Sequence, residues 1–397
     1  MGDFLINTTT RSLQFQPAVV SLRDSSYMAV WADRSDSSIK GQILRSSGAK
    51  TGGELTVSTP TPSDSNTNRQ WPTVVRAGFS VVAVWIEEPF NIPPPLPQVK
   101  LQRFVDGQKT GPEIQVSTTD IDPKNRPSVT SMIDGGSVVT WADSRQGQRI
   151  RAQRFDDEGR KAGPEFTANI TEGFHRRPVA TVLDDGRYVV AWTDDPSGIE
   201  GGRLTFRVFD LDGSPLGGEK ICTRTRGFFP GANAMTLLEN GRFVIASIET
   251  IAESDLGVPQ STVVANVFEA DGDGTEVINL SVGNPKGFNR SWPALAPLPG
   301  GRFLFTWVEK SATTFDTVPV VMAEICSDSQ GSLGEKIQVS TVATTGDRFQ
   351  VCAATSVDGS SESAFITWAD DTRTDGDASD FAVRGHAFRV DSPGSLV

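Results

Sequence analysis

The feature that most constrains this chain is an internal repeat. Each copy has a Pro, an apolar segment, a turn, a second apolar segment ending in Trp-x-Asp or Trp-x-Glu, a loop, a third segment, a Gly turn and a fourth segment. Two clear copies begin RPSVTSMIDGGSVVTWAD and RPVATVLDDGRYVVAWTD. The repeated positions are Trp31, Trp85, Trp141, Trp192, Ser247, Trp307 and Trp368, so seven copies follow one another at spacings of 51 to 61 residues.

Each copy predicts four short β-strands. Runs such as VVAVW, RYVVAW and RFLFTW are rich in β-branched and aromatic residues, and DDG, DGG and NG supply hairpin turns. No segment has an apolar period of 3.6 residues, so we expect almost no helix. Four-stranded units at this period are typical of propeller blades, whereas a solenoid would need capping repeats at its ends. The sequence therefore predicts an all-β, seven-bladed β-propeller of four-stranded antiparallel blades.

The two ends of the chain predict how the last blade is completed. The opening residues, GDFLINTTT, align with the fourth segment of other copies, such as GPEIQVSTT and GEKIQVSTV. The final copy stops after its third segment, VRGHAFRV, and the turn DSPG. We therefore expect residues 2–9 to supply the outer strand of blade seven, which removes the open sheet edges. On this prediction residues 1–397 form a single domain.

Charge and composition exclude several classes of partner. There are 37 Lys and Arg against 49 Asp and Glu, a net charge of −12, which disfavours nucleic acid and anionic membrane surfaces. No apolar run approaches 18 residues, so we expect no membrane insertion. The three Cys match neither a disulfide framework nor a zinc motif. The N-terminus has no signal-peptide pattern, which fits a cytoplasmic protein or an extracellular one whose signal peptide was removed.

The repeat also carries a resemblance. The pattern of DGG or DGR, VVxW, AQRFDxxG and a GPEFTANIT-like fourth segment resembles propeller-forming repeats of large bacterial extracellular and adhesin-like proteins. It extends over essentially the whole chain. The resemblance implies the propeller fold but no one function, because propellers serve as lectins, hydrolases, lyases and scaffolds alike.

Two sets of residues recur at the same end of the predicted blades. The acidic set lies two residues after each repeated Trp position: Asp33, Glu87, Asp143, Asp194, Glu249, Glu309 and Asp370. The leading set lies three residues before the first segment's Pro or its equivalent: Gln14, Arg69, Lys124, His175, Gly227, Arg290 and Arg348. Because a charge recurs in every blade, we favour contacts that link adjacent blades. The alternative is cation coordination, with Ca²⁺ as the ion and Asp33, Asp143, Asp194 and Asp370 as weak metal candidates.

The position before the Pro varies between blades, and this variation suggests binding. Trp71 and Trp292 stand where other blades carry Arg126, Arg177 or Gln. A Trp beside an Arg suits stacking on a sugar ring or a planar ligand. The predicted ligand-binding residues are Trp71, Arg69, Trp292, Arg290, His175, Arg177 and Arg126. The alternative is that both Trp rings close the end of the core.

Three functions remain open on the sequence alone. We favour a non-enzymatic recognition module, a lectin or adhesin-type propeller that binds carbohydrate or another small molecule through its loops. The second is a glycoside hydrolase or lyase, with His175 or a member of the acidic set as acid or base. The third is a protein-binding scaffold that uses the proline-rich segment 87–98. No catalytic residue pair can be nominated, and His386 aligns with the Gln of other copies and is expected to be structural.

Overall fold

A computed structural model describes residues 2–397 except residues 11, 61–65, 91–95, 145–147, 196–201, 225–233, 254–258, 270, 272–274, 282–286, 312–316, 342–345, 359–360, 372–380 and 392–394. The described residues form β-strands, turns and irregular connections, and none of them lies in a helix. Nothing in this part of the chain forms a helix long and apolar enough to cross a membrane.

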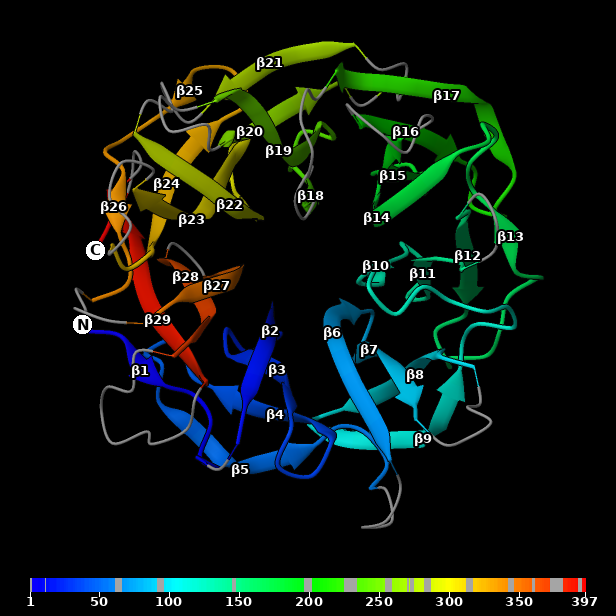
Figure 1. The fold of residues 1–397 in the computed structure, drawn as a ribbon, viewed down its shortest axis with the longest axis horizontal. Helices are drawn as coiled ribbons and strands as arrows, with labels where there is room; N and C mark the ends of the chain where they lie inside the picture. The colour runs from blue at the N-terminus through cyan, green and yellow to red at the C-terminus, as the bar shows by residue number, and fades with distance from the viewer. Residues whose placement is uncertain are drawn as a thin grey trace. The chain divides into compact units, whose positions relative to one another are not determined.

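The fold is an all-β, seven-bladed propeller of antiparallel sheets. Within the described residues, seven sheets follow one another in chain order (Figure 1). Strands pair with their neighbours in sequence, except that β1 (Phe4–Leu5) pairs with β29 (Ala382–Asp391) and β26 (Ile337–Gln338) pairs with β24 (Val320–Ser327). Hairpins join these strands because the turns DDG, DGG and NG allow the chain to reverse within a few residues. The predicted fold class is confirmed.

The strands of the first four sheets are β2 (Gln14–Ser21), β3 (Tyr27–Asp33), β4 (Ser38–Leu44), β5 (Lys50–Thr56), β6 (Thr67–Ala77), β7 (Ser80–Pro89), β8 (Gln98–Val105), β9 (Gln108–Gln115), β10 (Ser128–Ser131), β11 (Ser137–Ala142), β12 (Ile150–Phe155), β13 (Phe166–Thr167), β14 (Phe174–Val182), β15 (Tyr188–Asp195), β16 (Arg203–Phe209) and β17 (Pro215–Arg224). Those of the last three sheets are β18 (Ala234–Leu237), β19 (Phe243–Glu253), β20 (Pro259–Phe268), β21 (Glu276–Ser281), β22 (Phe288–Leu298), β23 (Arg302–Ser311), β24 (Val320–Ser327), β25 (Gly331–Ser332), β26 (Ile337–Gln338), β27 (Arg348–Asp358), β28 (Ser361–Asp370), β29 (Ala382–Asp391), β30 (Ser395–Leu396) and β1 (Phe4–Leu5).

The chain divides into two compact units. Unit 1 comprises residues 1–29, 42–54 and 225–397, and unit 2 comprises residues 30–41 and 55–224. Blades two to four therefore belong to unit 2 and blades five to seven to unit 1, while the first blade contributes residues to both. Each site described below lies within one unit.

The last blade is completed by the first strand, as the sequence predicts. Strand β1 pairs antiparallel with β29, with Phe4 opposite Gly385 and Leu5 opposite Arg384, so the two ends of the chain share one sheet (Figure 1). Beyond the strand, Ile6 N donates to Val383 O at 2.8 Å, and Val383 N donates to the Asn7 side chain at 2.8 Å. The regular strand is shorter than residues 2–9, and the short strand β30 also pairs with β29.

The core lies between neighbouring sheets. The second strand of a blade is buried along its length, as in YMAVWAD of β3 and SVVTWA of β11, which is why these segments read as continuous apolar runs. All six repeated Trp side chains are at most 1% exposed. Trp141, for example, packs in one cluster with Val84 and Leu101 of the preceding blade. Truncation of such a side chain to Ala costs about 3–5 kcal/mol of unfolding free energy.

Candidate functional site

Residues of the leading set lie on the first strand of a blade, directly opposite residues of the acidic set on the second strand of the same blade. Four such pairs occur in the described sheets: Arg69 opposite Glu87, His175 opposite Asp194, Arg290 opposite Glu309 and Arg348 opposite Asp370. In the three arginine pairs, Nε donates to the carboxylate at 2.6 to 2.9 Å. The expectation that these carboxylates link adjacent blades is wrong for these pairs, because each carboxylate is paired within its own blade.

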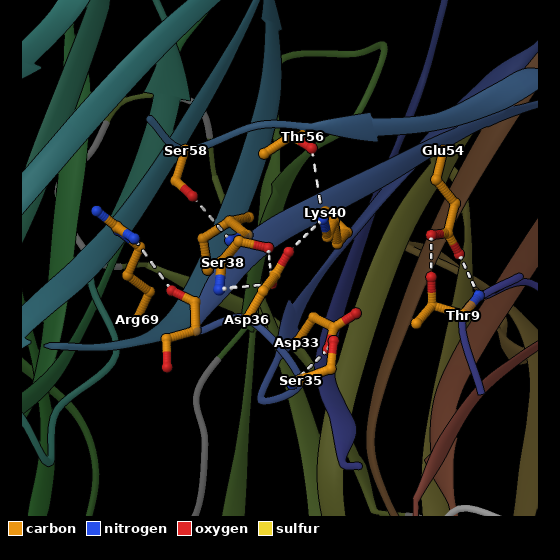
Figure 2. Close-up of polar contacts among 12 residues, drawn as sticks. Thr9, Asp33, Ser35, Asp36, Ser38, Lys40, Glu54, Thr56, Ser58 and Arg69 are labelled. Carbon is orange, nitrogen blue, oxygen red and sulfur yellow. Dashed lines mark hydrogen bonds and ion pairs between the residues drawn. The ribbon is translucent and has the colours of Figure 1, made fainter. Parts of the chain in front are cut away.

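The arginines, rather than the carboxylates, reach the preceding blade. Arg348 is 3% exposed, and besides Asp370 it donates to Pro319 O at 2.9 Å and to Thr341 O at 3.0 Å. Arg69 likewise donates to Ser37 O at 3.1 Å, and Figure 2 shows it pointing towards the segment that carries Asp36 and Ser38. Each of the three guanidinium nitrogens of Arg348 donates to a protein oxygen, so this side chain stabilises the contact between the two blades.

A second carboxylate position makes the inter-blade contacts that the sequence analysis missed. Outer-strand carboxylates accept hydrogen bonds from the backbone or hydroxyl groups that follow the previous blade's outer strand: Glu54 from Thr8 and Thr9, Glu113 from Thr59, Glu165 from Thr118 and Thr119, Glu219 from Ile170 and Thr171, and Asp3 from Thr341. Figure 2 shows the contact between Glu54 and Thr9. The recurring Gly-x-Glu of the fourth segment is the sequence pattern that could have identified them.

A third repeated contact fixes the outer strand within a blade. The Gln42, Gln102 and Gln153 side chains donate to carbonyls of the neighbouring outer strand, as Gln102 does to Gly111 O at 3.2 Å. His386 occupies the equivalent position in blade seven, where it is 9% exposed and stacks on Phe388 with ring centroids 4.1 Å apart. Burial lowers the pKa of His386. This environment agrees with a structural rather than a catalytic His.

The four metal candidates hold contacts of their own. Asp33 accepts hydrogen bonds from Ser35 N at 2.8 Å and its hydroxyl at 2.6 Å, and Figure 2 shows this turn. Asp143 accepts from Arg149 N at 2.8 Å. Asp194 lies 3.4 Å from Arg203, and Asp370 is paired with Arg348. Among the described residues no three His, Cys, Asp or Glu side chains come together as metal ligands would. The Ca²⁺ hypothesis stays a prediction.

Trp71 and Trp292 occupy a distorted point of the inner strand. Both have left-handed backbones, with φ of 55° and 53°, and each lies at a β-bulge where the pairing register shifts. A residue before Pro favours an extended backbone, so this conformation is unfavourable and must be stabilised by the surrounding sheet. Both rings are half-buried and pack on apolar clusters between blades. This packing supports a role in closing the core and leaves part of each ring open to solvent.

His175 is too deeply buried to contact a ligand, and Arg177 is only partly exposed. His175 is fully buried, with Nε2 2.8 Å from Thr171 O and Nδ1 3.4 Å from Asp194. Burial lowers its pKa to about 4, and the negative charge of Glu219 opposes that shift. Its ring therefore contacts protein atoms only. Arg177 and Arg126 are half-buried, and Arg177 has φ of 54° at the bulge of its own blade.

Glu249 is one of the members of the acidic set without a cation opposite; Gln14 stands at the leading position for Asp33, and Ile121 lies opposite Asp143. Blade five has Gly227 at the leading position, so the sequence supplies no cation opposite this carboxylate, although residue 227 lies outside the described part of the chain. Glu249 is half-buried, and no described residue forms an ion pair with it. Burial raises the pKa of its carboxyl group. A carboxyl that retains its proton above the usual range can act as a general acid.

A pocket lies at the opposite end of the blades, in unit 1. It has a volume of about 440 Å³ and is lined by Ser25, Ser46, Ser47, Asp358, Ser361, Glu362, Ser363, Ala387, Phe388, Arg389 and Val397. The three Ser of the first blade lie in its β2–β3 and β4–β5 turns, whereas the residues of the last blade come from the end of β27, the start of β28, the end of β29 and the last residue of the chain. The binding residues predicted from the variable position before the Pro, such as Trp71 and Trp292, are not among the residues that line this pocket. Residues 91–95, which are five of the twelve residues of the proline-rich segment 87–98, lie outside the described part.

No family model and no curated protein matches this chain. Among solved structures, an ulvan lyase bound to a GlcA-containing saccharide is 9% identical with a TM-score of 0.57, over 98% of this chain and 94% of that one. An α-L-arabinofuranosidase from Fusarium graminearum is 12% identical with a TM-score of 0.55, over 82% and 98% of the two chains. A protein of unknown function from Dyadobacter fermentans is 12% identical with a TM-score of 0.55, over 78% and 94%. These similarities show the fold. None of these neighbours is described as an adhesin, so the adhesin-like resemblance stays a prediction.

Proposed function

We propose that this protein acts on carbohydrate, and that it does so as a glycoside hydrolase. The observation that carries the proposal is Glu249, a half-buried member of the acidic set whose blade supplies no cation at the leading position and whose pKa burial raises. Two propeller neighbours are described as carbohydrate-active enzymes, which supports the same class of substrate. A polysaccharide substrate would place the protein outside the cell, in agreement with the second of the two locations left open by the sequence.

Hydrolysis fits the available acid and base groups better than elimination does. The chain has two His and two Tyr, and all four side chains are at most 9% exposed. The groups that can reach a substrate are therefore carboxylates and the cations Lys and Arg. Glycoside hydrolysis uses a carboxyl pair, in which a protonated carboxyl donates to the leaving oxygen. Glu249 is proposed as that acid, and the second carboxylate remains to be found by experiment.

The test is release of reducing ends from a glycan panel that includes arabinan, galactan and polygalacturonate. We expect Glu249→Gln to lower kcat by at least about 100-fold, since general acid catalysis contributes roughly 10²–10⁴ in rate, while binding of the same glycan is retained. Glu158→Gln, an exposed carboxylate on a hairpin turn of blade three, is the matched control and should leave kcat unchanged. Cleavage that survives Glu249→Gln would refute the assignment of the acid.

A second candidate is a glycan-binding module without catalysis. The 440 Å³ pocket favours it, because five Ser hydroxyls, the Phe388 ring and Arg389 offer the mixture of hydroxyl, aromatic and cationic groups that suits a monosaccharide. Binding of a panel glycan without cleavage, lost in Ser361→Val or in Trp71→Ala, would support this module. Absence of both binding and cleavage across the panel would refute a carbohydrate function.

A further inference from the structure

Unit 2 contains a hydrogen-bonded network, built on one carboxylate, that includes several basic residues. Asp122, in the connection before β10, accepts hydrogen bonds from Lys124 N at 3.0 Å, from the Asn125 side chain at 2.7 Å and from the Gln148 side chain at 2.7 Å. Arg176 Nε donates to the other end of the Gln148 amide at 3.3 Å. The backbone N–H of Arg177 donates to the side-chain oxygen of Asn125, Oδ1, at 3.3 Å. These bonds hold residues of blades three and four together.

The group carries more positive than negative charge in a chain whose net charge is −12. We call Lys124, Arg126, Arg176 and Arg177 the cationic cluster. Lys124 and Arg176 are exposed, and Arg126 and Arg177 are half-buried. Lys124 does not pair with Asp143 as its counterparts pair in other blades, because Ile121 lies opposite Asp143. Asp122 is the carboxylate bonded within the network, and the hydrogen bonds described for it come from a backbone N–H and two side-chain amides rather than from these cations.

The two adjacent arginines repel one another. Burial, and to a smaller extent the charge of the neighbouring Arg176, lower the pKa of Arg177 to about 10. A bound anion would relieve both effects, since an opposite charge favours the charged form. The Arg176 guanidinium also lies 5.6 Å from the centre of the Phe174 ring, and that ring is 41% exposed. The surface thus offers an aromatic face beside several cations.

We propose that the cationic cluster binds the carboxylate or sulfate groups of an anionic polysaccharide, an inference that rests on the proposed carbohydrate function. Arginine side chains bind carboxylate and sulfate oxygens with paired, charge-assisted hydrogen bonds. An exposed aromatic ring such as Phe174 stacks on the apolar face of a sugar. The acidic charge of the rest of the chain opposes nucleic acid, whose charges follow one another along the whole strand. Both polymers carry about one charge per residue, so the choice of a polysaccharide follows from the proposed carbohydrate function.

The test measures binding of three probes: polygalacturonate for carboxylates, dextran sulfate for sulfate esters, and neutral arabinan. We expect at least one polyanion to bind more tightly than arabinan, with an affinity that falls as salt is added. Arg176→Gln and Lys124→Gln should each weaken that binding by about tenfold, the usual effect of losing one charge-assisted hydrogen bond. Arg160→Gln removes the same charge from a hairpin turn of blade three and should change it by less than about twofold.

The outcomes separate this inference from the function on which it rests. Binding or cleavage of arabinan with no preference for either polyanion would overturn the anionic class and leave the carbohydrate function standing. A lack of binding to all three probes, together with no activity on the wider panel, would overturn both. Polyanion binding that is unchanged in Arg176→Gln and Lys124→Gln would overturn the location. Equal affinity for a single-stranded oligonucleotide would overturn the choice of polysaccharide over nucleic acid.

Discussion

Replacement of Glu165 tests whether the outer-strand carboxylates hold neighbouring blades together. The Glu165 side chain is 5% exposed and pairs with Arg151 at 2.8 Å. It also accepts hydrogen bonds from Thr118 N at 2.8 Å, from the Thr118 hydroxyl at 2.7 Å and from the Thr119 hydroxyl at 3.1 Å. Its loss therefore leaves a guanidinium and a backbone N–H of the preceding blade without their acceptor.

The expected cost follows from these contacts. Breaking a buried ion pair on one side costs about 3–5 kcal/mol of unfolding free energy. Arg151 retains 19% exposure, so water replaces part of the lost interaction and the lower end, about 3 kcal/mol for Glu165→Ala, is expected. Glu165→Gln keeps the shape and one acceptor and should cost about 1–2 kcal/mol. Glu158→Ala, at an exposed ion pair with Arg160, is the control and should change stability little.

The assay is urea unfolding followed by fluorescence of the buried Trp side chains, with amide exchange of Thr118 as the local measurement. We expect a lower urea midpoint and faster Thr118 exchange for Glu165→Ala, and neither for Glu158→Ala. Equal midpoints for Glu165→Ala and Glu158→Ala would refute the assignment of inter-blade bonding to Glu165. An unchanged Thr118 exchange rate would refute the proposed contact even if the protein as a whole were destabilised.

The same residue predicts a pH dependence. Burial by itself would raise the pKa of Glu165, but the hydrogen bonds from Thr118 and the pairing with Arg151 outweigh it and hold the pKa below 4.5. A carboxyl whose pKa is lower in the folded state stabilises the fold above its unfolded pKa. That stability is lost as the pH falls through the folded value. The stability difference between the native protein and Glu165→Gln should therefore shrink from pH 6 to pH 3.

Two further predictions concern the other structural contacts. Arg348→Met removes from the buried Asp370 its ion pair at 2.9 Å and leaves the longer contacts with Arg384 Nε at 3.7 Å and Trp368 Nε1 at 3.2 Å. It should cost about 3 kcal/mol, measured by urea unfolding, and an unchanged urea midpoint would contradict the importance of the pair. Trp71→Ala should cost about 1–2 kcal/mol, less than Trp141→Ala at about 3–5 kcal/mol, because Trp71 is half-buried and Trp141 is 1% exposed; equal losses would contradict this packing.

The fold followed from local pattern because each blade repeats the same information. β-rich segments, Gly-containing turns and the repeated Trp positions recur seven times. A strand or turn that is ambiguous in one copy can therefore be assigned by comparison with the other copies. The pairing of β1 with β29 was predictable for the same reason, since GDFLINTTT matches the fourth segment of complete copies. Periodicity of this kind is a property of the chain itself, and it needs no knowledge of which residues meet in space.

Which polar side chains face one another was decided only by the tertiary structure. Sequence spacing shows that Asp370 and Arg348 recur in register, but a bond within one blade and a bond between two blades give the same spacing. The sheet pairing places them opposite each other, and the preceding blade supplies Pro319 O and Thr341 O to the arginine. The Gly-x-Glu carboxylates were likewise visible in the sequence, yet their acceptor role depends on backbone groups of another blade, such as Thr118 N for Glu165.

Candidate binding groups also depended on burial that the sequence could not supply. His175 occupies a recurrent surface-like position in the repeat, yet the structure leaves it without exposure, whereas Lys124 at the corresponding position of blade three is exposed. Trp71 precedes a Pro, which favours an extended backbone, but the bulge in β6 imposes a left-handed one and directs the ring against the core. The sequence determined seven blades and their closing strand because these are local and repeated. Side-chain accessibility depends on the neighbouring sheet, and only the folded chain determines it.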